Sequence, residues 1–348
     1  MNVIEIYGIL LFFIAVFIII NGKYFKMPQA IGITLMAIFV ALLCVALEWS
    51  GLLLLDHSQI IFLNAEVFSR FVLDGVLMFL LFAGSLHINV GTLKKEATLI
   101  WGLSSVSVIL ATLIYGGLSF LLLPQIGLEI DFLTALILGA LVAPTDPIAV
   151  MNILKNFGLS KKMETLISGE SLFNDGAGYA VFIILLELVI PHGNLSGFGL
   201  LLKIMFEIAG GLSIGLLFGI LVSRLLKVVK EGSGGIMITL AVITTLLILS
   251  AKLGFSGPLS AVSFGVYLSS QRNGIPILSA DKSDFYIFWS VLDTLMNSML
   301  FLLLGLEVAV IHYDTTLLLG SLMVVFISLI ARFISVYIPL MVLGEEVR

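Results

Sequence analysis

Long apolar segments recur along this chain of 348 residues, and each approaches the length that crosses a lipid bilayer. A membrane-spanning helix needs about 20 predominantly apolar residues. Eleven segments meet this requirement, at about residues 3–21, 30–50, 71–91, 98–123, 132–155, 164–190, 199–227, 236–252, 257–271, 284–311 and 315–343. We therefore expect an all-α polytopic membrane protein with about 11 transmembrane helices in one domain, residues 1–348.

The composition excludes the main soluble classes of protein. Hydrophobic residues make up 60% of the chain and charged residues 11%, whereas soluble domains carry about 45–50% and about 25% respectively. Because so few charges could not cover a water-soluble globule, a cytosolic enzyme and a secreted domain are excluded. The formal net charge of −5 offers no basic surface for phosphates, so the expected partner is the lipid bilayer and not a nucleic acid.

Positive residues in the connections indicate which side of the membrane each connection faces. With the N-terminus outside, the inner side receives thirteen of them: Lys23, Lys26, Lys94, Lys95, Lys155, Lys161, Lys162, Arg224, Lys227, Lys230, Arg272, Lys282 and Arg348. The outer side receives three: Arg70, Lys203 and Lys252. This asymmetry predicts an N-out/C-in orientation. Since Val3–Ile20 has no positive residue before it and no cleavage site after it, we interpret it as a spanning helix rather than a signal peptide.

The fifth segment contains two prolines three residues apart, Pro144 and Pro147, with Thr145 and Asp146 between them. Each proline removes a backbone donor and clashes with the preceding turn, so this helix is expected to break. Irregular backbone at membrane depth is tolerated where it lines a cavity or is buried in protein. Because an unpaired carboxylate in a membrane is costly, Asp146 is a candidate for cation binding rather than part of a simple proline kink.

The sixth segment carries two polar pairs at helical spacing: Glu170 with Asn174, and Ser171 with Asp175. Residues four apart lie on one face of a helix. Their oxygen atoms are hard ligands of the type that suits a small cation. Asp175 lies about a dozen residues into its segment, close to the middle of the membrane. A purely structural, hydrogen-bonded Asp175 remains the alternative.

Other polar residues at membrane depth are weaker candidates. Arg332 must be paired or hydrated because arginine does not lose its proton in proteins, and we interpret it as a counter-charge. Asp293 and Asn297 could face the same cavity. Four acidic residues near the ends of spans are expected to be hydrated instead of transporting: Asp74, Glu187, Glu207 and Glu307.

Together these residues resemble a known family. Ala-Pro-Thr-Asp-Pro (143–147), followed by Gly-Glu-Ser-Leu-Phe-Asn-Asp-Gly (169–176), is similar to the signature of monovalent cation/proton antiporters. The Asn174-Asp175 pair resembles the electroneutral sodium/proton exchanger branch. Later segments, 301–307 and 331–333, resemble family segments in the same order. Family members often carry an acidic residue in the third helix, where this chain reads Phe-Ala-Gly (82–84), and they continue with two further helices after the arginine helix.

The resemblance implies a role for each site residue. Asp175 would carry the proton and the cation, and Na⁺ would be held by Asp175, Asp146, Ser171 and Thr145, with Glu170 assisting. Asn174 and Arg332 would be supporting residues, as would the two prolines that shape the break, Pro144 and Pro147. No cofactor is implied beyond the transported Na⁺ and H⁺.

The resemblance also implies an inverted-repeat antiporter fold, assembled as a homodimer in the cell membrane. Scaffold and dimerisation helices would occupy residues 1–95 and 198–283, and the ion-translocating core residues 96–197 and 284–348, with the second repeat incomplete. Exchange would be electroneutral and would proceed by alternating access. Partial desolvation favours a protonated carboxylate and a bound cation favours an ionised one, so the two substrates would compete for Asp175.

Three alternatives stay open from the sequence. A truncated antiporter fragment that does not transport, or that needs a partner, fits the absence of the last two family helices. A cation channel would use similar oxygens but favours several weak sites along a pore. An intramembrane aspartyl protease would need a Gly-x-Gly-Asp context, which is absent, so we do not expect an enzyme. The same oxygens would accept K⁺ or Li⁺ in place of Na⁺.

Overall fold

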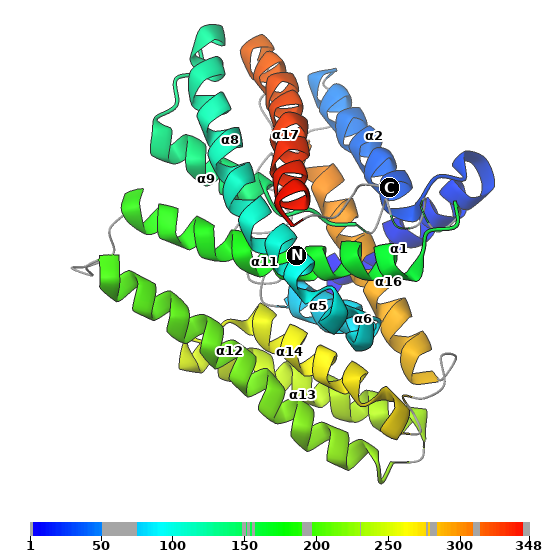
Figure 1. Cartoon of the computed structure of the whole chain (residues 1–348). Coiled ribbons are helices and arrows are strands. Elements are labelled where there is room, and N and C mark those ends of the chain that lie inside the picture. Colours follow the sequence, from blue (N-terminus) through cyan, green and yellow to red (C-terminus); the bar gives the residue numbers. More distant parts are fainter. Residues whose placement is uncertain are drawn as a thin grey trace.

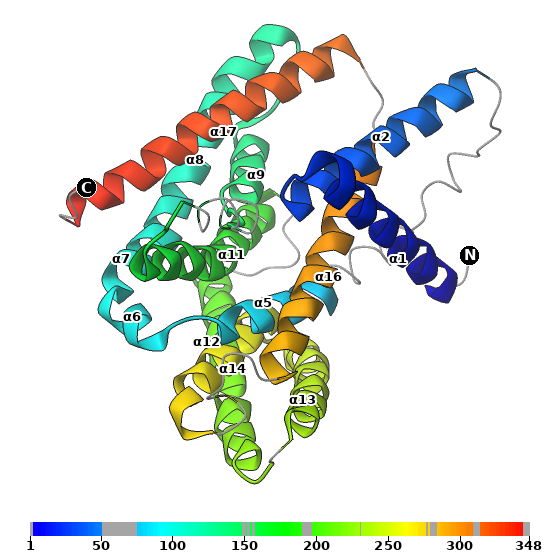
Figure 2. The ribbon, with the colours of Figure 1, turned by 90° about the vertical axis from the view of Figure 1, so that its right-hand side faces the viewer.

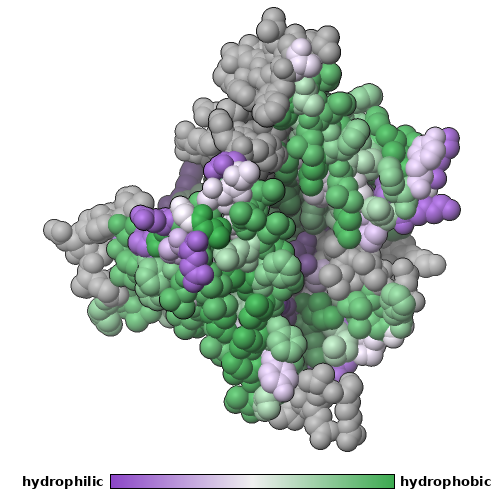
Figure 3. All heavy atoms as spheres, turned by 90° about the horizontal axis from the view of Figure 1, so that it is seen from above, coloured by the Kyte–Doolittle hydropathy of each residue, from purple (hydrophilic) through white to green (hydrophobic). Residues whose placement is uncertain are grey.

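The computed structural model describes residues 3–50, 75–147, 151, 154, 157–189, 197–229, 231–275, 278, 284–308 and 314–343. Over these ranges the chain is helical and contains no β-strand. Eight helices within the described ranges are long and apolar enough to cross a membrane. Apolar residues cover most of the described surface that is seen in Figure 3, with hydrophilic residues gathered in a few patches. The expected all-α multi-pass fold is therefore confirmed.

The helices follow the apolar segments closely. Their bounds are α1 Val3–Ile20, α2 Gln29–Trp49, α5 Leu77–Leu86, α6 Val90–Lys95, α7 Ala97–Trp101, α8 Ser107–Leu122, α9 Phe132–Val142, α11 Lys161–Val189, α12 Gly197–Leu226, α13 Gly232–Leu253, α14 Gly257–Ser270, α16 Asp284–Glu307 and α17 Thr315–Val342. The fourth expected span is one continuous helical stretch, Ala97–Ile126, in which a π-helical turn, Gly102–Val106, joins α7 and α8. In the expected second half of the fifth span, residues 148–150, 152, 153 and 155 lie outside the described residues.

Helices that are far apart in the sequence pack side by side (Figures 1 and 2). One group is formed by α8, which packs on α9 and α17, and by α11, which packs on α9. In a second group α14 packs on both α12 and α5. Helix α16 packs on α2 and α5 and so connects the N-terminal helices to the second group.

Aromatic side chains hold α5, α14 and α16 together. Phe82 stacks on Phe264 with ring centroids 4.8 Å apart, and it meets Trp289 edge to face at 4.7 Å. All three side chains are fully buried. Such pairs contribute about 0.5–1.5 kcal/mol beyond the burial of their area. This cluster fixes the helices on one side of α11.

Glycines allow α12 and α14 to approach closely. A methyl group on Gly211 would lie 2.5 Å from the carbonyl oxygen of Ser256, and one on Gly215 would overlap the backbone of Ser260. Small residues permit such contact between membrane helices, whose association depends on close packing. The α12–α14 pair is consequently a tightly packed unit.

The start of α9 is fixed by a side-chain cap. The carboxylate of Asp131 accepts hydrogen bonds from the backbone N–H of Leu133 at 3.0 Å and of Thr134 at 3.1 Å. These bonds satisfy donors that the first turn of a helix leaves free. The hydrogen bond from the Thr134 hydroxyl is the main cause that lowers the pKa of Asp131 below its usual value.

Candidate functional site

The segment that follows α9 is not helical, and it lies against α11. Helix α9 ends at Val142, and residues 144–147 have no regular secondary structure. A proline at either end of this segment explains the loss of helical hydrogen bonding. A methyl group on Gly178 would overlap the ring of Pro144, with the Pro144 Cδ at 3.1 Å. The glycine therefore lets the Pro144 segment approach α11.

We expect Gly178→Ala to destabilise the protein, because the added methyl group would collide with a proline ring that cannot rotate away. Overpacking of this kind costs about 1–3 kcal/mol. The measurement is the melting temperature of the purified protein in detergent. Gly117→Ala is the matched control, since a methyl group at Gly117 of α8 meets nothing within 4 Å. Equal melting temperatures for the two variants would contradict this packing.

Asn174 connects the Pro144 segment to α11. Its side chain is fully buried. The Nδ2 amide donates to the Glu170 carboxylate at 3.0 Å, and it contacts both the backbone oxygen and the hydroxyl of Thr145 at 3.4 Å. The buried Oδ1 of Asn174 accepts no hydrogen bond from the described part of the chain. Asn174 thus positions Thr145, and its Oδ1 atom remains available as an acceptor.

Glu170 forms an ion pair with Arg332 on α17. The Nη2 of Arg332 donates to the Oε1 of Glu170 at 2.8 Å. The side chain of Glu170 is 10% exposed and that of Arg332 is 27% exposed, so the pair is mostly removed from solvent. The sequence predicts Arg332 as a counter-charge but does not indicate its partner. The structure pairs it with Glu170, 162 residues away.

A hydroxyl pair supports the helix that carries Arg332. Ser107 of α8 donates to Ser335 of α17 at 3.3 Å, and Ser335 donates to the backbone oxygen of Arg332 at 3.1 Å. Both serines are fully buried. This contact holds α8 and α17 together one turn from Arg332, and no local pattern in the sequence indicates it.

Asp175 lies on α11 beside these groups and is half-buried. The charges of Asp146 and of Glu170 both act on it, which places three carboxylates in one neighbourhood. Ser171, one turn before Asp175 on the same helix, is also half-buried. The carboxylates and hydroxyls predicted from the sequence therefore come from α11 and from the irregular segment beside it.

Asp293 on α16 lies within electrostatic range of Asp146. Asn297, one turn later, is buried, and its side chain interacts with the carboxylate of Asp293. From the sequence, both residues are possible members of the cavity that contains the predicted ion site. The structure brings Asp293 toward the site from a third helix.

The site offers oxygen ligands but no ready-made site for a resident metal ion. Among the described residues, no three His, Cys, Asp or Glu side chains converge as metal ligands do. An arrangement of two or more carboxylates with hydroxyl and carbonyl oxygens suits a cation that is bound weakly and released. This chemistry fits a transported ion.

Comparison with known proteins decides the family. The family described as "Sodium/hydrogen exchanger, transmembrane" matches residues 9–348. The chain belongs to this sodium/hydrogen exchanger family. Its relatives include the Na(+)/H(+) antiporter NhaP of Pseudomonas aeruginosa, which is 31% identical over 85% of this chain and 70% of that protein. The Na(+)/H(+) antiporter NhaH of Halobacillus aidingensis is 25% identical over 95% of this chain and 79% of its own length.

The fold of this exchanger-family chain matches a solved structure. The sodium proton antiporter MjNhaP1 from Methanocaldococcus jannaschii superposes with a TM-score of 0.77, at 20% identity, over 100% of this chain and 80% of that chain. The antiporter fold expected from the sequence is thereby confirmed. As a member of the exchanger family the chain is a multi-pass transporter of the cell membrane and not an enzyme. Its family needs no cofactor.

Proposed function

We propose that this protein exchanges a monovalent cation, Na⁺ in the first place, for H⁺ across the cell membrane. The observation that carries the proposal is the placement of Asp175 beside Asp146 and Glu170 in a chain of the exchanger family. The printed names of relatives, Na(+)/H(+) antiporters from Pseudomonas aeruginosa and Halobacillus aidingensis, support sodium and protons as the substrates.

Asp175 is the proposed carrier of both substrates. Asp146, Ser171 and Thr145 supply the other oxygens around Na⁺. Asn174 and Arg332 organise the site, and the Arg332 ion pair supports a positioning role for Glu170, which assists the cation from the edge of the site. Pro144 and Pro147 keep the segment between them free of helical hydrogen bonds, so that its backbone oxygens can bind the cation.

Competition for Asp175 couples the two fluxes in this proposal. A bound cation stabilises the ionised carboxylate, and a bound proton removes the charge that attracts the cation. Because the neighbouring position is the neutral Asn174 and not a second aspartate, one proton exchanges for one monovalent cation. Transport is then electroneutral and is driven by the two concentration gradients alone.

The architecture that we propose completes the antiporter fold. It has about 11 spanning helices in N-out/C-in orientation, a fifth helix broken at the two prolines, and inverted repeats. Residues 96–197 and 284–348 form the moving core, which is supported by the mutual packing of α8, α9, α11 and α17. Residues 1–95 and 198–283 form the scaffold and the homodimer interface. Movement of the core against the scaffold provides alternating access.

The proposal is tested with the purified chain in lipid vesicles that contain a pH-sensitive dye. An inward Na⁺ gradient should alkalinise the lumen, and K⁺ or Li⁺ in place of Na⁺ should give the ion preference. Clamping the membrane voltage with a potassium ionophore should leave the rate unchanged. A rate that depends on the voltage would contradict electroneutrality, and the absence of proton flux with all three cations would contradict the function.

A further inference from the structure

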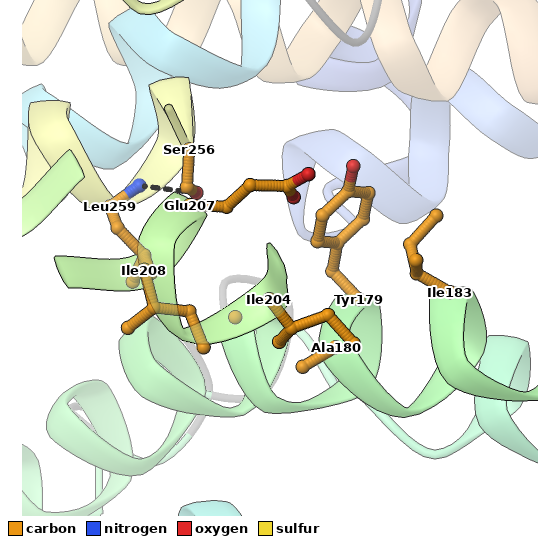
Figure 4. A pocket seen from close by; sticks show the side chains of 9 residues that line it. Tyr179, Ala180, Ile183, Ile204, Glu207, Ile208, Ser256 and Leu259 are labelled. Atoms are coloured by element: carbon orange, nitrogen blue, oxygen red, sulfur yellow. Dashed lines mark hydrogen bonds between the residues drawn. The ribbon is translucent and has the colours of Figure 1, made fainter. Parts of the chain in front are cut away.

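A small crevice lies between α11 and the α12–α14 pair, outside the residues assigned to the ion site (Figure 4). Its lining includes Gly176 and Tyr179 of α11, Glu207 of α12, and Ser256 at the start of α14. The cavity volume is about 10 Å³. Since about 10–15 Å³ is needed to hold one water molecule, the crevice fits a single water or a dehydrated monovalent cation.

Glu207 provides the negative charge of this crevice. The sequence predicts that it is hydrated near the end of a span, but it follows the first residue of α12 by ten residues and is half-buried. Apolar residues of the same helix, Ile204 and Ile208, line the crevice beside it. A carboxylate inside a span is costly and requires compensation by a cation, a proton or a hydrogen-bond donor.

Tyr179 faces Glu207 from the other side of the crevice. In Figure 4 the carboxylate of Glu207 and the hydroxyl of Tyr179 extend into the same space from α12 and α11. Ser256 contributes a third oxygen at the beginning of α14. A carboxylate, a phenol and a hydroxyl are hard oxygen ligands, which suit alkali cations better than soft metals.

The crevice adjoins the proposed carrier residue along α11. Gly176, which lines the crevice, directly follows Asp175 in the chain. Tyr179 is four residues after Asp175, and residues at this spacing lie on one face of a helix. The crevice and Asp175 therefore occupy neighbouring positions on α11.

The two walls of the crevice differ in how they are attached: α12 and α14 are bonded to each other, whereas α11 makes few contacts with them. The backbone N–H of Ser256 donates to the backbone oxygen of Glu207 at 2.9 Å, which ties α12 to α14. In contrast, α11 packs mainly on α9 and only lightly on α14. Glu207 thus belongs to the rigid wall, while Tyr179 and Asp175 belong to the helix on the opposite side.

We propose that Glu207, with Tyr179, forms an access site that holds and partly dehydrates a monovalent cation before it reaches Asp175. This inference rests on the proposed antiport function and adds a residue that sets the apparent affinity for the cation. The cation occupies this site before it occupies the site at Asp175. Loss of Glu207 consequently weakens capture of the cation without changing the maximal rate.

The test is the initial rate of Na⁺-driven proton flux as a function of Na⁺ concentration, for the full chain in vesicles. Glu207→Gln should raise the apparent KM for Na⁺ by about three- to tenfold, because a charge-assisted contact becomes a neutral one. The maximal rate should stay unchanged. Tyr179→Phe should raise KM by about twofold, since only one neutral oxygen ligand is lost.

Glu187→Gln is the matched control, because Glu187 is a half-buried acidic residue of α11 that does not line the crevice. It should leave KM unchanged. An unchanged KM for Glu207→Gln, or a lower maximal rate at the same KM, would overturn the access site while antiport stands. Absence of flux in the unaltered chain would overturn the proposed function, and this inference with it.

Discussion

Asp175→Asn is expected to reduce Na⁺-driven proton flux to the level of protein-free vesicles. The amide keeps the shape of the side chain but can neither bind a proton reversibly nor neutralise a cation. The measurement is the vesicle assay with a lumenal pH dye. The exposed Asp314→Asn, at the start of α17, is the matched control and should retain the full flux.

The same variant should not lose thermal stability. Asp175 lies in the field of two other carboxylates, Asp146 and Glu170, so removal of its charge relieves repulsion in the folded protein. We therefore expect a melting temperature equal to or above that of the unaltered chain. An inactive variant with a lower melting temperature would indicate misfolding, and an active Asp175→Asn variant would contradict the carrier assignment.

The ion pair between Glu170 and Arg332 should give the largest effect on stability. Removal of one partner leaves a charge in a site that is mostly removed from solvent, and for buried pairs this costs about 3–5 kcal/mol. Because the two side chains keep 10% and 27% exposure, we expect the lower end of that range for Glu170→Gln and for Arg332→Gln. The measurement is thermal unfolding in detergent, followed by the flux assay.

The double variant measures how strongly the two residues stabilise the protein as a pair. Glu170→Gln with Arg332→Gln leaves no unpaired charge, so it should be less destabilised than the sum of the two single variants. Both single variants should also transport poorly. In Glu170→Gln the Asn174 amide exchanges a charged acceptor for a neutral one, and in Arg332→Gln the Glu170 acceptor loses the ion pair that fixes its position. Strictly additive losses of stability would show that the two residues act independently.

The spanning helices could be predicted from the sequence because a bilayer imposes a length and an apolar composition on each of them. The expected segment 199–227 corresponds to α12, Gly197–Leu226, and 315–343 to α17, Thr315–Val342. The π-helical turn Gly102–Val106 could not be predicted in this way. The turn contains no proline, and its sequence, Gly-Leu-Ser-Ser-Val, is compatible with an ordinary α-helix, so the change in backbone hydrogen bonding has no clear signal in the sequence.

The candidate site was predictable where the residues are close in sequence. The spacing of Glu170 and Asn174 predicts one helical face, and the two side chains are hydrogen-bonded at 3.0 Å. Contacts between distant segments were not predictable. No local pattern pairs Arg332 with Glu170 or brings Asp293 toward Asp146, because these depend on how α16 and α17 pack.

The surroundings of Glu207 could not be predicted from the sequence either. Counted along its span it lies near an end, which predicts a hydrated side chain. Its crevice is formed by Tyr179 of α11 and by the start of α14, and both are positioned by tertiary packing. The spacing of Tyr179 four residues after Asp175 is the one local signal that could have directed attention to this surface.

The central claim is that proton and Na⁺ compete for Asp175, and it is tested most directly by measuring the apparent KM for Na⁺ at a series of proton concentrations. Competition for one carboxylate predicts that, on the acidic side, each tenfold rise in proton concentration raises this KM by up to about tenfold, with the maximal rate unchanged. An apparent KM that stays constant while the maximal rate falls would contradict it, because the proton would then act at a site separate from the cation.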